Sequence, residues 1–346
     1  MAHDCICYSR ALFFEYMHSL IIKDDFGELA GCLEKLNIES RKICIVTDEN
    51  VAELYYSIVK QTLKPLSDQI TKYVLKPGEK SKSISSITDI ISFLSWKEFT
   101  REDFILALGG GTVSDVAGLA ASLFMRGIKL VNIPTTLLAQ VDAAIGGKNG
   151  VDFDGQKNLI GSFYLPQIVY INRSVTDTLP EHEKSNGMAE LIKTAIISEG
   201  KFESDVDSCA RFKLKVINQD FKDVGLRHIL NFGHTCGHAI EASSDYKLSH
   251  GESVGLGMIC AFFISQNRGW IAPTETAGLY NALRIAGLPV AFHIVDRDAV
   301  INLIHKDKKS RDGHTQFVLL KGLGNPVITD DVSDEEIITA LEKIDE

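Results

Sequence analysis

The sequence has no Cys-x-x-Cys pair, no excess of positive charge and no long apolar run. Its seven cysteines are odd in number and scattered, which favours reduced thiols in a cytoplasmic compartment. The net charge of −10 gives no global field that would attract nucleic acid or an anionic membrane. No uncharged apolar segment is long enough to span a bilayer, and the first residues lack the pattern of a signal peptide. We therefore expect a cytoplasmic protein that binds neither nucleic acid nor membrane and that holds any anionic ligand by local positive charge.

The chain of 346 residues is long enough for two domains. Strand-like and helical segments alternate through its first half, which is typical of a parallel sheet with helices on both faces. After about residue 178 the alternation gives way to long helical patterns, one of them over 225–242, and to a short hairpin-like segment at 315–320. The sequence predicts an α/β N-terminal domain of nucleotide-binding type with a parallel, Rossmann-like sheet over 1–175. It predicts a mostly α-helical C-terminal domain over 176–346.

Gly109, Gly110 and Gly111 stand between a strand-like segment and an apolar helical one. Glycine lets the backbone approach a ligand closely, and a helix N-terminus offers free N–H groups to a pyrophosphate. The spacing is not the usual dinucleotide fingerprint, and a plain tight turn explains the three glycines equally well. Polar residues on later glycine-rich segments are Asp142, Lys148, Lys157 and Asn158. We expect these segments to be loops at the carboxyl side of the sheet, where α/β proteins bind ligands.

The segment 231–252 holds three of the ten histidines. His234 and His238 are four residues apart, so a helix places them on one face, and a polar loop can fold His250 back. Two imidazoles and one carboxylate are the usual protein ligands of a catalytic zinc site. A better source of the carboxylate than the local residues is Glu190, because Lys193 lies one helical turn away and could hold an anionic substrate. The local candidates are Glu241 and Glu252. Taken alone, such a histidine pattern more often belongs to an ordinary helix and loop.

Six motifs occur in order: GGGTVSDVAG, RGIKLVNIPTTLLAQVDAAIGGKNGV, KNLIGSFYLP, TLPEHEKSNGMAELIK, GLRHILNFGHTCGHAIE and LSHGE. With them the chain resembles the sugar-phosphate cyclases, and most closely the 3-dehydroquinate synthases, from about residue 42 to 325. The resemblance implies conversion of 3-deoxy-arabino-heptulosonate 7-phosphate to 3-dehydroquinate and phosphate, a step of the shikimate pathway of aromatic amino acid biosynthesis. It also implies catalytic NAD, a Zn²⁺ or Co²⁺ ion, and a homodimer.

The resemblance also assigns roles to individual positions. It implies that the first domain binds NAD and the second binds the metal and substrate. The metal ligands it implies are Glu190, His234 and His250. Residues that match NAD-binding positions are Asp48, Asn50, Glu79, Lys82, Gly109, Gly110, Gly111, Asp115, Thr135, Thr136, Lys157 and Thr178. Residues that match substrate-binding positions are Arg126, Asp142, Lys148, Asn158, Lys193, Lys213, Arg227, Asn231, His238 and Lys308. The implied catalytic residues are His238, Lys148, Lys193, Arg227 and Asp223.

The implied chemistry explains these residue types. Because the substrate carries a carboxylate and a phosphate, an acidic protein needs a local cluster of lysines and arginines to bind it. NAD oxidises a secondary hydroxyl with the metal as Lewis acid, and the resulting ketone acidifies the neighbouring C–H so that phosphate leaves. NADH then returns the hydride, the ring opens, and an aldol step closes the carbocycle. His238 would titrate near neutral pH, which suits a proton relay.

Two departures from the family pattern leave alternatives open. Asp142 is followed by two alanines where the family commonly has two serines, and Asp223 stands where a glutamate is usual. A paralogous cyclase that makes an amino-dehydroquinate, a valiolone or a deoxy-inosose would share the scaffold, although Asp115 favours dehydroquinate. A metal-dependent NAD alcohol dehydrogenase would share the glycine-rich turn but would not need the phosphate-binding lysines. A catalytically silent sugar-phosphate binding protein would have lost a ligand or a lysine, and none is lost.

Overall fold

The computed structural model describes residues 19–245, 247–307 and 315–345, which fold as two compact units. The first unit runs to Pro134 and resumes over Ala144–Asn172, and the second takes Thr135–Ala143 and the chain from Arg173 onward. The segment 135–143 therefore belongs to the second unit, whereas the sequence analysis placed it in the first domain. The predicted division of labour between 1–175 and 176–346 stays a prediction.

A parallel six-stranded sheet forms the centre of the first unit, as the sequence predicts. Its strands, in sheet order, are β1 (Ser19–Lys23), β8 (Ile168–Asn172), β5 (Lys129–Pro134), β4 (Phe104–Gly109), β2 (Ile43–Asp48) and β3 (Ile70–Leu75). β4 is buried along its whole length, which explains its uninterrupted apolar sequence. The α/β class is confirmed, and β8 is a strand that the sequence analysis did not identify.

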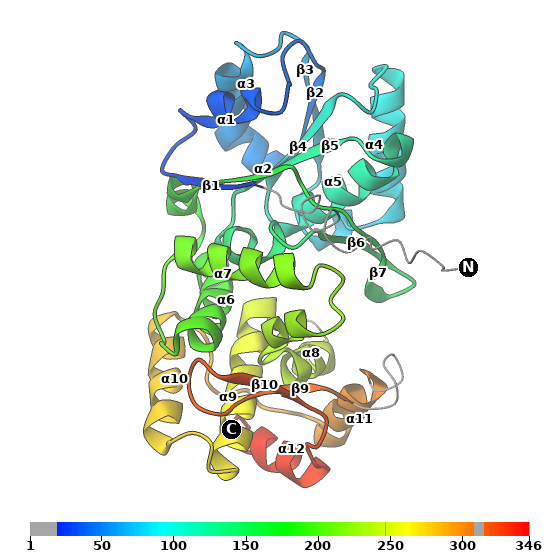
Figure 1. The fold of residues 1–346 in the computed structure, drawn as a ribbon. Helices are drawn as coiled ribbons and strands as arrows, with labels where there is room; N and C mark the ends of the chain where they lie inside the picture. The colour runs from blue at the N-terminus through cyan, green and yellow to red at the C-terminus, as the bar shows by residue number, and fades with distance from the viewer. Residues whose placement is uncertain (1–18, 246, 308–314, 346) are drawn as a thin grey trace, which may run out of the picture. The chain divides into compact units, whose positions relative to one another are not determined.

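Helices cover the sheet on both faces, with α1 and α3 on one side and α4 and α5 on the other (Figure 1). The helical segments of this unit are α1 (Leu29–Glu34), α2 (Glu49–Val51), η2 (Ala52–Tyr56), α3 (Ser57–Leu63), η3 (Glu79–Ser81), α4 (Ile84–Trp96), α5 (Gly111–Leu123) and η4 (Phe124–Arg126). From β2 the chain adds β3 at one edge of the sheet. It then returns to β4 on the other side of β2 and continues from there to β5 and β8 in the opposite direction. This reversal lies between β2 and β4, whose last residues are Asp48 and Gly109. Open α/β sheets bind ligands at such a reversal, outside the carboxyl ends of the strands.

The glycine-rich segments around Lys148 and Lys157 form a hairpin rather than the expected loops. β6 (Lys148–Phe153) and β7 (Gln156–Phe163) pair antiparallel around a two-residue turn. Asp154 and Gly155 in the turn have φ values of 51° and 71°. Two successive positive φ values are those of a type I′ turn, for which Asp-Gly is a preferred sequence. The hairpin could therefore have been predicted from this dipeptide.

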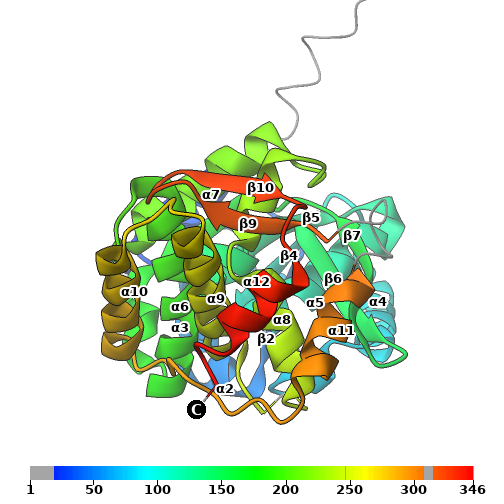
Figure 2. The same ribbon diagram turned by 90° about the horizontal axis from the view of Figure 1, so that it is seen from below.

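The second unit is mostly helical, as predicted, and its core surrounds α9 (Figure 2). Its helices and turns are η5 (Ala139–Ala143), η6 (Arg173–Thr178), α6 (Glu181–Glu199), α7 (Val206–Gln219), η7 (Leu226–Asn231), α8 (His234–Ser243), α9 (His250–Asn267), α10 (Pro273–Ile285), α11 (Arg297–Asp307) and α12 (Asp334–Leu341). The predicted hairpin is confirmed as β9 (Phe317–Leu320) paired with β10 (Pro326–Thr329). In the part of the chain that the structure describes, no helix combines the length and the apolar character needed to cross a membrane.

The single helix predicted over 225–242 is wrong, because the chain breaks at Gly233. Gly233 has a φ of 78° and serves as the N-cap of α8, so the 3₁₀ turn η7 and the helix α8 are separate elements. A Cβ atom on Gly233 would lie 2.7 Å from Cγ of Met258 and 3.0 Å from the carbonyl oxygen of Val254 on α9. The break thus lets α8 start directly against α9.

Replacement of Gly257 by alanine tests this close approach of α8 and α9. The added Cβ would lie 1.9 Å from the carbonyl oxygen of Gly233, so the two helices would have to separate. We expect Gly257→Ala to lower the free energy of unfolding by roughly 2–3 kcal/mol in chemical denaturation. Gly255→Ala is the matched control on the same helix, because its Cβ would meet only the end of the Leu283 side chain at 3.4 Å. Equal denaturation midpoints for the two variants would show that the close approach of α8 and α9 does not require glycine at position 257.

Candidate active site

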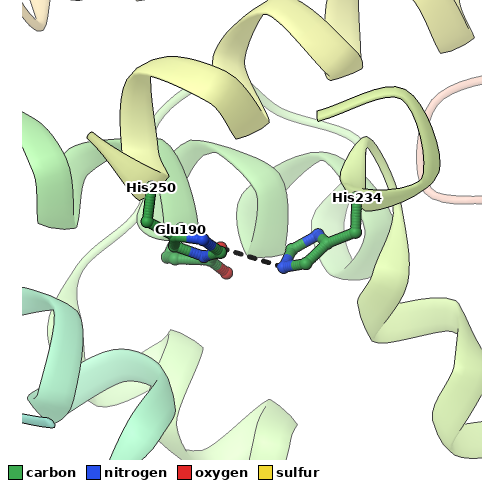
Figure 3. A group of neighbouring side chains, drawn as sticks. All are labelled: Glu190, His234 and His250. Atoms are coloured by element: carbon green, nitrogen blue, oxygen red, sulfur yellow. Dashed lines mark hydrogen bonds and ion pairs between the residues drawn. The ribbon is translucent and has the colours of Figure 1, made fainter. Parts of the chain in front are cut away.

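Three potential metal ligands converge in the second unit from three different helices (Figure 3). Glu190 lies in the middle of α6, while His234 and His250 are the first residues of α8 and α9. Oε1 of Glu190 is 3.4 Å from Nε2 of His234 and 3.3 Å from Nε2 of His250. The potential ligand atoms of the three residues all lie within 4.8 Å of one another. A single ion can therefore contact all three.

The protonation states of these side chains fit a divalent metal. Burial opposes ionisation of Glu190, but Lys193 and the neighbouring imidazoles outweigh it and hold the pKa of this carboxyl well below its usual range. Burial and the Lys193 ammonium lower the pKa of His234 well below its usual value, so its imidazole is neutral. An ionised carboxylate and a neutral imidazole are the forms that bind metals. A carboxylate with two imidazoles is also a usual protein ligand set of catalytic zinc.

His250 behaves differently from His234 in the absence of a metal. Burial opposes its protonation, but the neighbouring carboxylates of Glu190 and Glu241 outweigh this and raise the pKa of His250 to about 9. A metal that binds Nε2 of His250 must therefore displace a proton.

The two local carboxylates considered from the sequence have different surroundings. Glu252 caps α9, because its side chain accepts a 2.7 Å hydrogen bond from the backbone N–H of Ser249 while Ser249 Oγ accepts from the backbone N–H of Glu252. Glu241 lies closer to the histidines, with Oε2 3.9 Å from Nδ1 of His250. It forms a second group of potential ligands with His250 and His238. His238, which the spacing alone suggested as a ligand, therefore lies beside the Glu190 group and is not a member of it.

Buried cations lie near this group in the same unit. Lys193 Nζ pairs with Oε2 of Glu190, and Lys213 Nζ pairs with Oδ1 of Asp142 on η5. Both lysines and Arg227 are almost fully buried. Burial lowers the pKa of Lys213 to about 8 against the opposing effect of Asp142. Desolvated cations of this kind attract anionic groups more strongly than surface lysines do.

Asp220, which the sequence analysis did not identify, organises the loop that carries Asp223 and Arg227. Its carboxylate accepts hydrogen bonds from the backbone N–H groups of Val224 (3.0 Å), Gly225 (2.8 Å) and Arg227 (3.0 Å). Burial opposes its ionisation, but these donors lower the pKa of Asp220. The loop places Asp223 at a φ of 58°, with its carbonyl oxygen 2.9 Å from Nε2 of the buried His228.

The first unit brings together three of the residues that match NAD-binding positions. Lys82 Nζ lies 2.8 Å from Oδ2 of Asp115 and 3.6 Å from Oε1 of Glu79. Glu79 also accepts a 3.1 Å hydrogen bond from Oγ1 of Thr112 in the first turn of α5. Gly109 is required for packing, since a Cβ there would lie 2.5 Å from Cβ of Val113. Gly110 and Gly111 begin α5 as its N-cap and first residue.

The hairpin carries a second set of predicted residues in the first unit. Lys148 and Asn158 line a cavity of about 300 Å³ together with Asp115, while Lys157 is exposed on β7. The structure therefore brings Asp115, assigned to NAD, close to two residues assigned to the substrate.

The other predicted residues make different contacts. Asp48 caps α2 by accepting from the backbone N–H of Val51. Thr136 accepts from the backbone N–H of Ala139 and Thr178 donates to the carbonyl oxygen of Val175. Asn50 and Arg126 are exposed, and Asn231 is half-buried. Thr135 is buried and is the first residue of the second unit. Lys308 lies outside the described residues. The roles of all these residues stay predictions.

A doubly wound parallel sheet in one unit and a carboxylate–dihistidine group in a helical unit are the features expected of a metal-dependent enzyme of α/β class. The family of 3-dehydroquinate synthases matches residues 72–186 with its N-terminal part and 187–310 with its C-terminal part. The chain belongs to the 3-dehydroquinate synthase family.

Individual relatives agree with this assignment. The chain is 38% identical to the 3-dehydroquinate synthase of Ruminiclostridium cellulolyticum over 344 residues, which cover 94% of this chain and 95% of the relative. It is 40% identical over 331 residues to that of Clostridium botulinum, covering 90% and 94%. Among solved structures, the 2-epi-5-epi-valiolone synthase of Streptomyces hygroscopicus with NAD⁺ and Zn²⁺ bound is similar with a TM-score of 0.86 and 26% identity, covering 95% and 97%.

Replacement of Asp220 by asparagine tests its role in the loop. The amide keeps one acceptor oxygen but loses the charge, so the three backbone N–H groups, which are buried or part-buried, lose a charged partner. We expect Asp220→Asn to lower the free energy of unfolding by about 2 kcal/mol in urea denaturation. Asp205→Asn is the control, because Asp205 caps α7 at the surface through Ser208 N and asparagine caps helices equally well. A loss no larger than the control's would show that Asp220 does not hold the loop.

Proposed function

We propose that the protein is a 3-dehydroquinate synthase that converts 3-deoxy-arabino-heptulosonate 7-phosphate to 3-dehydroquinate and phosphate with catalytic NAD and a Zn²⁺ or Co²⁺ ion. The observation that carries this proposal is the group of Glu190, His234 and His250, which occurs in a chain of the 3-dehydroquinate synthase family. The related valiolone synthase structure, which holds NAD⁺ and Zn²⁺, supports the same pair of cofactors.

The relatives also favour dehydroquinate over the products of paralogous cyclases. Identity to the two 3-dehydroquinate synthases is 38% and 40%, compared with 26% to the valiolone synthase. The alcohol dehydrogenase alternative has no comparable support in sequence, and it does not explain the buried Lys193 and Lys213.

When bound, the metal supplies Lewis acidity and NAD accepts a hydride and later returns it. The chain's own residues bind and orient the substrate. Lys193, Lys213 and Arg227 supply positive charge for its carboxylate and phosphate, because the protein as a whole is acidic. His238 lies beside the metal ligands, with its ring centroid 5.1 Å from that of His234, and is exposed to solvent. It is therefore suited to exchange protons between substrate and water.

The remaining parts of the proposal concern NAD and assembly. Glu79, Lys82 and Asp115 form the central contacts to NAD, near the reversal in strand order. Lys148 and Asn158 contribute to substrate binding from the hairpin. We infer a homodimer in the cytoplasm, which size-exclusion chromatography and cell fractionation would test.

The deciding experiment mixes the purified protein with the heptulosonate phosphate, a trace of NAD and zinc or cobalt. We expect phosphate and 3-dehydroquinate in equal amounts, with no net NADH, since the hydride returns to the product. Dehydroquinate is followed by its dehydration with a coupling enzyme. No turnover, with NAD and metal still bound, would favour a paralogous cyclase that acts on another sugar phosphate, and NADH that accumulates without phosphate would favour a dehydrogenase.

The pKa of Lys213 predicts a pH dependence of substrate binding. Because burial lowers this pKa to about 8, the ammonium is charged below pH 8 and neutral above it. If it binds the substrate's anionic group, KM should rise by up to about tenfold between pH 7 and pH 9 as the charge is lost. Arginine keeps its charge throughout this range, so Lys213→Arg should flatten the rise. Steady-state kinetics across this range give KM and kcat separately.

Lys201→Arg is the control for this experiment, since Lys201 is exposed and pairs with Glu199 at the protein surface, with 3.2 Å between Nζ and Oε2. It should leave the wild-type pH profile unchanged. A Lys213→Arg enzyme that keeps the full rise in KM would show that another group titrates.

A further inference from the structure

His250 has a carboxylate near each of its two ring nitrogens. Nε2 lies 3.3 Å from Oε1 of Glu190, and Nδ1 lies 3.9 Å from Oε2 of Glu241. Glu190 comes from α6 and Glu241 from α8, so two different helices approach the ring from its two nitrogen sides. The ring therefore has one nitrogen directed to the metal group and the other to a carboxylate outside it.

The surroundings of Glu241 on α8 disfavour an ionised carboxylate unless a cation or a hydrogen-bond donor lies beside it. Its side chain is buried, with 8% of its surface exposed. It also lies in the last turn of α8, where the helix dipole opposes negative charge. A buried carboxylate in such a place requires hydrogen-bond donors or a cation. The imidazole of His250 is one such neighbour, with Nδ1 at 3.9 Å from Oε2 of Glu241.

A histidine that binds a metal through one nitrogen commonly donates its other N–H to a carboxylate. This contact fixes the tautomer and the ring orientation, and it raises the basicity of the ligating nitrogen. Glu241 could instead be a ligand itself, together with His238 and His250. The group of Glu190, His234 and His250 is better suited to hold the ion than the group of His238, Glu241 and His250. The first group has a fully buried carboxylate and no exposed member, whereas the second includes the exposed His238.

We propose that Glu241 is a positioning residue that holds His250 with Nδ1 protonated and Nε2 free for the metal. The inference rests on the proposed metal site and goes beyond it, because Glu241 is not among the ligands. It places the carboxylate outside the ligand set, where it acts on the metal only through the imidazole.

The test measures metal affinity in the full-length protein by competition with a chelator, for zinc and for cobalt. Glu241→Gln removes the charge and should raise the metal dissociation constant 10–100-fold. Glu241→Asp keeps the charge and should restore part of the affinity. The cobalt absorption spectrum should keep its overall shape in both variants, because the three ligands are unchanged. Thermal melting of the metal-free variants shows whether they fold.

Glu252→Gln is the matched control, because it removes a carboxylate that is only two residues from His250. The Glu252 side chain caps α9 by accepting a hydrogen bond from the backbone N–H of Ser249. Glutamine serves equally in a capping box, so affinity should stay within about threefold of wild type. Glu190→Gln should abolish tight binding.

A second readout follows the tautomer directly. In the zinc-loaded wild type, ¹H–¹⁵N correlation spectra should show His250 protonated at Nδ1, and this proton should exchange faster with water in the Glu241→Gln variant. A purely structural role of Glu241 would not change this signal.

Four outcomes would overturn the inference. Equal affinities for Glu241→Gln and Glu252→Gln would show that Glu241 does not act on the metal. A Glu241→Gln loss as complete as that of Glu190→Gln, with a changed cobalt spectrum, would make Glu241 a ligand. An unchanged exchange rate of the His250 Nδ1 proton in Glu241→Gln would show that Glu241 does not interact with this N–H. Failure of the wild type to bind either metal would reject the proposed metal site, and the inference with it, while leaving the family assignment in place.

Discussion

The second unit depends on one constraint, the complete burial of the Glu190 carboxylate. A buried charge is tolerated only when opposite charges and hydrogen bonds compensate it, and here Lys193 and His250 do so. Each histidine is the first residue of a helix, so the ring positions are set by where α8 and α9 begin. Gly233 and the Ser249 cap fix those starting points. Because α9 is the central helix of the core, the packing that stabilises this unit also fixes the geometry of the ligands.

The distribution of charge explains how an acidic protein can bind a doubly anionic substrate. The net charge is −10, yet three cations are buried in the second unit, and Arg227 is held there by a loop that closes on Asp220. In the first unit, Lys82 lies between two carboxylates near the reversal in strand order. Local burial, rather than overall charge, therefore determines where anions can bind.

Much of this architecture could be predicted from the sequence, because its signals are local. Alternating apolar segments predicted the parallel sheet, and the family motifs pointed to Glu190, His234 and His250. Spacing alone suggested His238 as a ligand, since four residues on a helix share a face. The structure instead groups His234 with His250 on α9 and with the expected carboxylate, Glu190 on α6, whereas His238 forms a second group with Glu241 and His250. The break at Gly233 and the three donors around Asp220 likewise depend on contacts formed after folding. The Asp-Gly turn of the hairpin was a local signal that the sequence analysis overlooked.

The central claim is that one metal ion is held by Glu190, His234 and His250. Anomalous X-ray diffraction at the zinc absorption edge, from crystals of the zinc-loaded protein, tests it most directly. The account predicts a strong anomalous peak within bonding distance of these three side chains, about 2.0–2.2 Å from their oxygen and nitrogen atoms, with Glu241 beyond that distance. A peak bonded instead to His238 and Glu241, or no peak in this region, would contradict it.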